Sequence, residues 1–308
     1  MVKVMSIVLP AFNEENNILL SHQVISEFLN EHQIQYELIY VNDGSKDHTW
    51  DEIMKLTAVE KNVVGINFSR NFGKEASIDA GLKSATGDCV VVMDCDLQHS
   101  PEALIEMYAK WQEGYEVVEG IKKSRGKEGV MHSLFAKTFY KFMTKAIGID
   151  MENSSDYKLL DRRVVDELNA LPEKNRFFRA LSFWVGFKQT TVEYDVLERQ
   201  EGETKWCFTS LMKYALNNIM SFTSVPLQLV TVVGSLYLIF AFLLSIKVFG
   251  QYFAGHALEG FTTVIILLLI IGSTILIALG IIGLYIGKIY QELKGRPSYI
   301  VKEKIKYD

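Results

Sequence analysis

Two long runs without a charged residue dominate the second half of this 308-residue chain. The first extends from Val225 to Ile246 and the second from Phe261 to Gly287. A helix crosses a bilayer with about 20 mostly apolar residues, and each run is long enough for that. Core helices of ordinary length do not explain runs of this kind. The sequence therefore predicts a hairpin of two membrane-spanning helices over residues 225–288.

The basic residues around these runs predict their orientation. The loop between them carries only Lys247, His256 and Glu259 as charged or titratable groups. The basic residues outside the runs are Lys205, Lys213, Lys288, Lys294, Arg296, Lys302, Lys304 and Lys306. Because basic residues gather on the cytoplasmic side of spans, we expect a multi-pass protein of the cell membrane. The domain that precedes the runs, residues 1–207, and both termini would be cytoplasmic, with residues 289–308 as a basic cytoplasmic tail.

Residues 1–207 alternate between strand-like and helix-like patterns. The apolar, β-branched stretches "MSIVLP", "YELIYV", "NVVGINF" and "CVVVMD" are separated by segments with helical spacing. Such alternation with short loops predicts an α/β domain with a mostly parallel sheet, of the nucleotide-binding type. The formal net charge of −5 disfavours a nucleic-acid partner, because nucleic-acid binders usually present a basic surface.

Two further segments have amphipathic helical spacing. In residues 131–147, apolar side chains share one face, while Lys137, Lys141 and Lys145 recur four residues apart on another. This pattern is typical of a helix on an anionic membrane surface. An ordinary surface helix with a solvated lysine face has the same pattern, and the apolar runs nearby favour the membrane. Residues 208–224 carry a second apolar stripe, and we expect a juxtamembrane helix there.

Acidic residues, with one asparagine, come shortly after three of the strand-like stretches. Asn13 and Glu14 follow the first stretch, Asp43 follows the second, and Asp94 and Asp96 follow "CVVVM". In an open α/β sheet, ligands bind at the carboxyl ends of the strands. Neighbouring carboxylates repel one another, and Mg²⁺ or Mn²⁺ removes that cost, commonly together with substrate phosphates. The sequence thus predicts a metal that bridges to a diphosphate.

Each of these motifs alone also has an ordinary structural explanation. An Asp-x-Asp triplet is common in loops, and "NDGS" alone is typical of a β-turn followed by a helix cap. Their combination at one sheet edge is what favours a ligand site.

Four motifs together resemble those of a known family. "VLPAFNEE", "VNDGSKDHT", "MDCDLQHSPE" and "VEGIKKSR", in this order, are similar to the motifs of the GT-A glycosyltransferases of family 2. "RFFRALSFWVGFKQ", "RQEGETKW" and the two apolar runs narrow the resemblance to the polyisoprenyl-phosphate sugar transferases. This group includes enzymes that resemble dolichol-phosphate mannose synthase and the bacterial undecaprenyl-phosphate glucosyltransferases. The resemblance implies a GT-A nucleotide-sugar-binding domain, then amphipathic interfacial helices and a transmembrane hairpin.

The resemblance also implies roles for individual residues. The residues expected to bind the nucleotide sugar are Pro10, Ala11, Asn13, Glu14, Asp43, Asp94 and Lys122. The expected ligands of Mg²⁺ or Mn²⁺ are Asp94, Asp96 and Gln98. The residues expected to bind the acceptor phosphate are Arg125, Arg199 and Lys205. The residues expected to be catalytic are Asp96, Arg125 and Asp156.

The chemistry of the acceptor explains why cations matter at such a site. A lipid phosphate with a second pKa of about 6 is largely dianionic at neutral pH, so it needs little help from a general base. The protein must instead bring two anions together and stabilise the departing diphosphate. A solvated charge run is the alternative for the basic residues in "KKSRGKEG". For Asp156, which matches the position of a catalytic aspartate in bacterial relatives, the alternative is a loop-ordering or helix-capping role.

The leading hypothesis is an inverting glycosyltransferase that moves a hexose, glucose or N-acetylglucosamine, from a UDP-sugar to undecaprenyl phosphate at the cytoplasmic face. One alternative is a processive polysaccharide synthase, which would normally have more spans and a Gln-x-x-Arg-Trp motif. Another is a non-catalytic nucleotide-binding membrane scaffold, which the intact acidic motifs disfavour. Expected partners are the UDP-sugar, polyprenyl phosphate, membrane lipids, a flippase and a downstream glycosyltransferase. By the resemblance we also expect a homo-oligomer, a tetramer.

Overall fold

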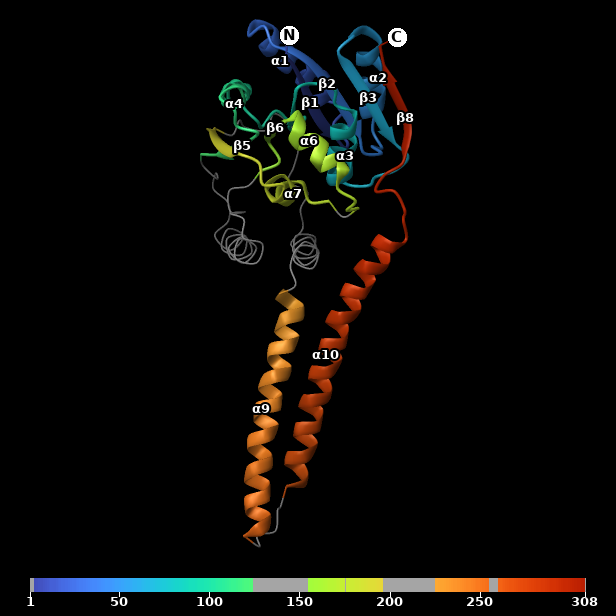
Figure 1. Ribbon diagram of the computed structural model, residues 1–308. Helices are drawn as coiled ribbons and strands as arrows, with labels where there is room; N and C mark the ends of the chain where they lie inside the picture. The colour runs from blue at the N-terminus through green and yellow to red at the C-terminus, as the bar shows by residue number, and fades with distance from the viewer. Residues whose placement is uncertain (1–2, 124–154, 175, 196–224, 255–259, 308) are drawn as a thin grey trace. The chain divides into compact units, whose positions relative to one another are not determined.

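The computed structural model describes residues 3–123, 155–174, 176–195, 225–254 and 260–307 (Figure 1). The chain divides into two compact units, one formed by residues 1–206 with 296–308 and the other by residues 207–295. The two predicted amphipathic helices, residues 131–147 and 208–224, lie outside the described residues.

The first unit begins with four parallel strands. They are β1 (Val4–Ala11), β2 (Gln35–Asn42), β3 (Val63–Phe68) and β4 (Cys89–Val92). The helices between them are α1 (Asn17–Glu31), α2 (Thr49–Val59) and α3 (Lys74–Ser84). The strand β1 pairs in parallel with β2 on one side and with β4 on the other, and β2 pairs in parallel with β3. The predicted α/β domain with a mostly parallel sheet is confirmed.

The remainder of this unit extends the sheet at both edges. Its elements are α4 (Pro101–Gln112), β5 (Val117–Lys122), β6 (Lys158–Asp161), α6 (Arg162–Ala170), α7 (Phe178–Trp184), β7 (Gln189–Tyr194) and β8 (Val301–Lys306). Eight strands of the described part form one sheet in the order β7-β5-β6-β4-β1-β2-β3-β8. The strand β6 is antiparallel to β4, with Lys158 opposite Val92. This register brings the residues just before β6 to the carboxyl end of β4.

The central strands are buried on both faces, as their sequences predict. Ile7 and Leu9 of β1, Leu38 of β2 and Val91 of β4 have no exposed surface. A strand covered by helices on both faces reads as an unbroken apolar run, which is the pattern of "CVVV" in β4. The polar residues that follow these strands therefore stand out sharply against the core.

The C-terminal residues, expected as a basic cytoplasmic tail, include a β-strand. Helix α10 (Phe261–Leu293) is followed by β8, which pairs antiparallel with β3 as the edge strand of the sheet. In "VKEKIK" lysine alternates with other residues, and Ile305 is the one partly buried side chain. Lysines are typical of exposed edge strands, because their charge discourages pairing with another chain. Several of the basic residues expected in the tail thus belong to an edge strand.

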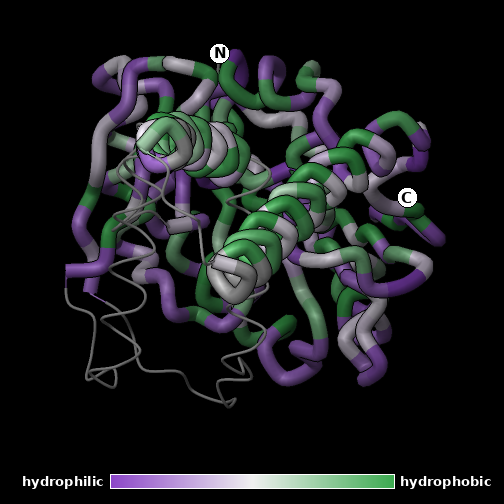
Figure 2. The backbone as a smooth tube through the Cα atoms, turned by 90° about the horizontal axis from the view of Figure 1, so that it is seen from below, coloured by the Kyte–Doolittle hydropathy of each residue, from purple (hydrophilic) through white to green (hydrophobic). Residues whose placement is uncertain are grey.

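The second unit contains the two predicted apolar helices, α9 (Val225–Phe253) and α10. In the described part of the chain, two helices are long and apolar enough to cross a membrane by length and composition. Figure 2 shows mainly hydrophobic colouring along both of them. Their large side chains point outward, as for Leu238, which is 74% exposed. These two helices could form the predicted transmembrane hairpin.

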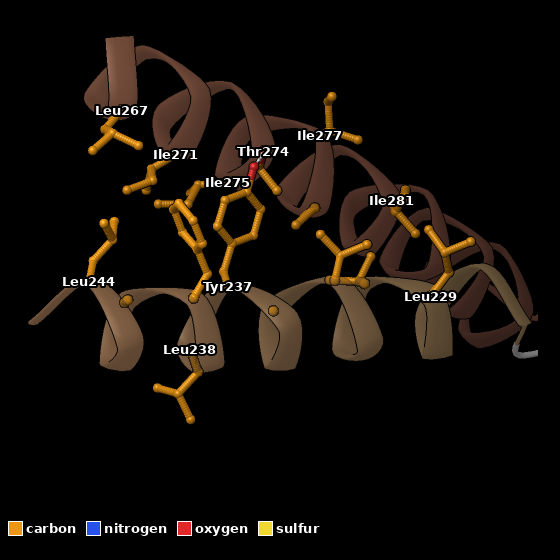
Figure 3. A pocket seen from close by; sticks show the side chains of 16 residues that line it. Leu229, Tyr237, Leu238, Leu244, Leu267, Ile271, Thr274, Ile275, Ile277 and Ile281 are labelled. Atoms are coloured by element: carbon orange, nitrogen blue, oxygen red, sulfur yellow. Dashed lines mark hydrogen bonds between the residues drawn. The ribbon is translucent and has the colours of Figure 1, made fainter. Parts of the chain in front are cut away.

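A cavity of about 450 Å³ lies between α9 and α10 (Figure 3). Its sixteen lining residues are apolar or uncharged. The hydroxyl groups of Tyr237 and Thr274 approach to 3.2 Å across it. Leu238 points away from the partner helix, whereas Tyr237 points toward it. A cavity without a charged group does not fit the phosphate or metal ligands that the sequence motifs predict.

The glycine of the "NDGS" turn predicts a local test of the fold. Gly44 has φ = 64°, and a Cβ built there would lie 2.4 Å from the backbone carbon of Arg70. We expect Gly44→Ala to lower the free energy of unfolding by about 3 kcal/mol, because positive φ and a backbone clash add. Gly114→Ala is the matched control, since Gly114 has φ = 92° but an added Cβ meets nothing within 4 Å. It should cost about 1 kcal/mol.

The measurement is chemical denaturation of the purified full chain, followed by tryptophan fluorescence. Equal losses for the two variants would show that Arg70 does not confine the turn.

Candidate active site

A cavity of about 320 Å³ lies at the carboxyl ends of β1, β2 and β4. Its lining residues come from the ends of these strands and from the start of α3: Pro10, Ala11, Phe12, Glu14, Asp43, Asn71, Gly73, Lys74, Ser77, Asp94, Cys95 and Asp96. Of the residues predicted to bind the nucleotide sugar or the metal, the structure brings Pro10, Ala11, Glu14, Asp43, Asp94 and Asp96 into this lining.

Asp43 organises the wall between β2 and α3. It is 4% exposed, and its two carboxylate oxygens accept hydrogen bonds from the backbone N–H groups of Phe72 (2.6 Å) and Gly73 (2.9 Å). Burial raises the pKa of this carboxyl, and the two N–H donors partly offset that effect. Each carboxylate oxygen has further lone pairs, so Asp43 can still accept a hydrogen bond from a ligand in the cavity.

Asn13 and Glu14 form the loop after β1. Asn13 has φ = 55°, its side-chain oxygen accepts from the backbone N–H of Lys46 (2.9 Å), and its own N–H donates to Ser45 Oγ (2.9 Å). Asn13 therefore joins this loop to the "NDGS" turn and does not line the cavity. Glu14 lines the cavity, and its Oε2 accepts from Asn17 Nδ2 at 2.6 Å.

A chain of opposite charges lies beside the cavity. Lys74 Nζ is 2.6 Å from Asp94 Oδ1 and 2.9 Å from Asp156 Oδ2. The guanidinium of Arg179 donates from Nε and one terminal nitrogen to the two oxygens of Asp156, at 2.7 and 3.0 Å. Lys74 begins α3, Asp94 follows β4, Asp156 precedes β6 and Arg179 lies in α7. These ion pairs therefore join four separate parts of the sequence.

These ion pairs shift the pKa of each acidic group. Burial alone would raise the pKa of Asp156, but Lys74 and Arg179 outweigh it and hold that pKa well below the usual range. Burial likewise opposes ionisation of Asp94, and mainly Lys74 lowers the net pKa of that carboxyl. Both groups are therefore carboxylates at neutral pH. A carboxylate held this firmly in its ionised form is a poor proton acceptor.

Asp96 lies at the mouth of the cavity in a tight loop. Its Oδ1 accepts from the backbone N–H of Gln98 at 3.2 Å, and Leu97 between them has φ = 56°. The backbone N–H of Asp94 donates to His99 Nδ1 at 3.2 Å. His99 is buried and stacks on Tyr157 with ring centroids 4.5 Å apart. This contact fixes the loop that presents both aspartates.

The donor atoms here fit a hard divalent cation. Asp94 and Asp96 offer carboxylate oxygens on one loop, and Mg²⁺ is commonly held by one or two carboxylates with substrate phosphates and water. Within the described residues, no group of three or more His, Cys, Asp or Glu side chains has the arrangement of a complete metal site. A metal at this loop would thus need oxygens from a bound diphosphate. Gln98, the third predicted ligand, contributes a backbone hydrogen bond and does not line the cavity.

Glu75, the residue after Lys74, is a further acidic residue close to the ion pairs of Lys74, Asp156 and Arg179. Its Oε2 accepts from the backbone N–H of Phe178 at 2.8 Å. Burial, with a contribution from the charge of Asp156, raises the pKa of Glu75 to about 7. Glu75 therefore links α3 to the start of α7 by a hydrogen bond.

Sequence reasoning missed Lys74, Glu75 and Arg179. Lys74 had a local signal, because it opens a helix at the same sheet edge as Asp43 and Asp94. Arg179 had none beyond the resemblance, since only the folded chain brings it to Asp156.

The other predicted basic residues fall into two groups. Lys122 ends β5, is exposed, and does not line the cavity. Arg125, Arg199 and Lys205 lie outside the described residues.

Known proteins are similar to this chain over nearly its whole length. The uncharacterized glycosyltransferase YkcC of Bacillus subtilis (strain 168) is 40% identical over 300 residues, which cover 97% of this chain and 93% of that protein. The prophage bactoprenol glucosyl transferase homolog of Escherichia coli (strain K12) is 36% identical over 299 residues, 96% and 98% of the two chains. The bactoprenol glucosyl transferase of Shigella phage SfII is 36% identical over 300 residues, 97% of each chain.

Solved structures support the fold. Glucosyl-3-phosphoglycerate synthase from Mycobacterium tuberculosis, solved with Mn²⁺, UDP and phosphoglyceric acid, has a TM-score of 0.53 at 19% identity, and the match covers 71% of this chain and 76% of that one. The α/β sheet is therefore that of the GT-A fold. Residues 6–168 also match the domain described as glycosyl transferase family 2. With this match and the relatives above, the chain belongs to glycosyl transferase family 2.

Proposed function

We propose that this protein transfers glucose from UDP-glucose to undecaprenyl phosphate, with inversion at the sugar carbon, at the cytoplasmic face of the cell membrane. The observation that carries the proposal is the similarity over 96% of the chain, apolar helices included, to a protein named as a bactoprenol glucosyl transferase homolog. N-acetylglucosamine, the other sugar that the sequence left open, is less well supported because the relatives with a named sugar are glucosyl transferases.

The cavity at the sheet edge would hold the donor. Asp43 and Glu14 can accept hydrogen bonds from the base and ribose, and Pro10 and Ala11 line the same wall. Asn13 acts by shaping the loop, given its bonds to the "NDGS" turn. Lys122, at the end of β5, would approach the donor from outside the lining.

The acidic loop would hold the metal. Mg²⁺ or Mn²⁺ bound to Asp94 and Asp96 would supply positive charge to the diphosphate. Lys74 already bonds to Asp94 and lines the cavity, so it places a second positive charge beside the leaving group. Preorganised positive charge of this kind stabilises the charge that develops as the sugar–phosphate bond breaks.

The acceptor reacts as an anion. An oxygen of the lipid phosphate forms the new bond to the sugar carbon while the bond from that carbon to the diphosphate oxygen breaks and UDP departs. Because the attacking phosphate is already deprotonated, no residue must remove a proton. We therefore assign Asp156 to holding Lys74 and Arg179 in place, and not to acting as a base. Arg125, Arg199 and Lys205 remain the proposed acceptor-phosphate contacts, and Arg125 the proposed catalytic cation.

The hairpin would keep the site close to its lipid substrate. The helices α9 and α10 are long enough to span a bilayer, and basic residues at both ends favour cytoplasmic termini. The proposed division of the chain is a catalytic domain over residues 1–207, a juxtamembrane helix over residues 208–224 and a hairpin over residues 225–288. A homotetramer, a flippase and a downstream glycosyltransferase complete the proposed set of partners.

The test is an assay of membranes carrying the protein, incubated with radiolabelled UDP-glucose, UDP-N-acetylglucosamine or GDP-mannose and a short polyprenyl phosphate. A lipid-linked monosaccharide made from UDP-glucose is the expected product. A polymer would favour a processive synthase, and no product from any donor would favour a non-catalytic scaffold.

Asp96→Asn tests the acidic loop. The amide keeps the size of the side chain but removes the charge that holds a divalent cation, so we expect the turnover number to fall at least about 100-fold. Asp166→Asn is the control, because Asp166 is an exposed aspartate of α6 whose charge lies 3.7 Å from Arg162. It should transfer glucose at the wild-type rate. Full activity of Asp96→Asn, or of wild type after chelation of divalent ions, would refute the metal assignment.

The pH dependence tests whether Asp156 is a base. At low acceptor concentration the rate should rise with pH through about 6, the second pKa of the acceptor phosphate, and then level off. Asp156→Asn should lower the plateau but keep this inflection. Burial raises the pKa of the neighbouring Glu75 to about 7, so Glu75→Gln is made in parallel and should also keep the inflection. Loss of the inflection in Asp156→Asn alone would mean that Asp156 takes up the proton.

A further inference from the structure

Two acidic residues lie one turn apart on α3, on the face that meets the segment leading into α7. Glu75 accepts the backbone N–H of Phe178 at 2.8 Å, and Asp79 Oδ1 lies 2.6 Å from a terminal nitrogen of Arg176. Residues four apart on a helix share a face, and residues 176 and 178 alternate along the facing segment. Residues 176–178 are therefore fixed along α3 at two points.

The ion pair between Asp79 and Arg176 is almost completely buried. The side chain of Asp79 is 2% exposed and that of Arg176 11%. Arg176 also donates to the backbone carbonyls of Leu171 (2.9 Å) and Glu173 (3.2 Å). A single guanidinium thus fixes the connection between α6 and α7, and its own position depends on Asp79.

The residue that follows this fixed segment is the active-site cation Arg179. Its guanidinium bonds to both oxygens of Asp156, which also pairs with Lys74 at the start of α3. The contacts therefore join α3 and α7 at two places. At one, Asp79 and Glu75 of α3 hold Arg176 and Phe178; at the other, Lys74 of α3 pairs with Asp156, which holds Arg179. These contacts fix the distance between the two cations beside the cavity.

A further contact reaches Asp79 from the far end of the chain. Ser298 Oγ donates to Asp79 Oδ2 at 3.4 Å, and Lys83 Nζ lies 3.0 Å from the same oxygen. A cavity of about 360 Å³ opens among these segments, so the buried carboxylate is not packed on every side. Its charge interactions, more than close apolar packing, hold the segment around Arg176.

We propose that Asp79 is a positioning residue for glycosyl transfer, which acts through Arg176 to hold Arg179 on Asp156. Only the kinetic test of this inference rests on the proposed function. Asp79 does not line the cavity at the sheet edge, so it would touch neither substrate of the proposed reaction. Its removal should therefore lower the turnover number while the KM for the nucleotide sugar stays nearly constant.

The kinetic test compares Asp79→Asn, Arg179→Met and the double variant in the full-length protein. We expect Asp79→Asn to lower kcat about 10- to 50-fold, with the KM for UDP-glucose changed less than twofold. Because Asp79 acts through Arg179, the double variant should be no slower than Arg179→Met alone. Asp79→Glu, which keeps the carboxylate, should recover at least a third of the wild-type kcat. Asp166→Asn again serves as the control.

A second measurement does not depend on activity. Hydrogen exchange of the amides in residues 176–184 should become at least tenfold faster in Asp79→Asn, because Arg176 loses its anionic partner and no longer holds this segment on α3, and should be unchanged in Asp166→Asn. Additive losses of kcat in the double variant, or unchanged exchange, would overturn the proposal. If wild type transfers no sugar, the proposed function fails, and the exchange measurement alone decides whether Asp79 holds the segment.

Discussion

The bridge from Lys74 to two carboxylates is the interaction on which the rest of the site depends. The sheet brings Asp94 and Asp156 to one edge because β4 and β6 are neighbours, and two buried carboxylates there would repel each other strongly. Lys74 removes that repulsion, and Arg179 supplies the second positive charge. Removing one partner of such a buried pair leaves an uncompensated charge, so the arrangement holds only as a whole.

The local sequence pattern was enough to predict the polar residues at the strand ends. Asp94 follows a strand that is apolar along its whole length, and Asp43 follows the buried second half of β2. Parallel strands with short loops must bring such residues to one edge. Arg179 shows where that reasoning stops. Its partner Asp156 precedes an antiparallel strand inserted between β4 and β5, an arrangement that depends on tertiary pairing and leaves no periodic signal in either segment.

Charge composition alone does not predict the strand at the C-terminus. Lys302 and Lys304, expected as part of a basic cytoplasmic tail, belong to an edge strand whose partner, β3, lies more than two hundred residues earlier. Strand pairing over such a separation is set by register with β3, where Ile305 meets Gly65. The polar motifs of the sheet edge were easier to identify, because buried apolar strands make a following carboxylate conspicuous.

The cations around Asp156 suit a reaction between two anions better than they suit proton transfer. A carboxylate with two cationic partners stays ionised across the neutral range, which removes it as a base but lets it hold Lys74 and Arg179 at fixed positions. In the proposed reaction a lipid phosphate and a diphosphate would repel each other, and that repulsion is one part of the barrier that the protein must lower. Cations already oriented in the folded site need not reorganise when the phosphates arrive, and this preorganisation is the largest electrostatic advantage that such a site can offer.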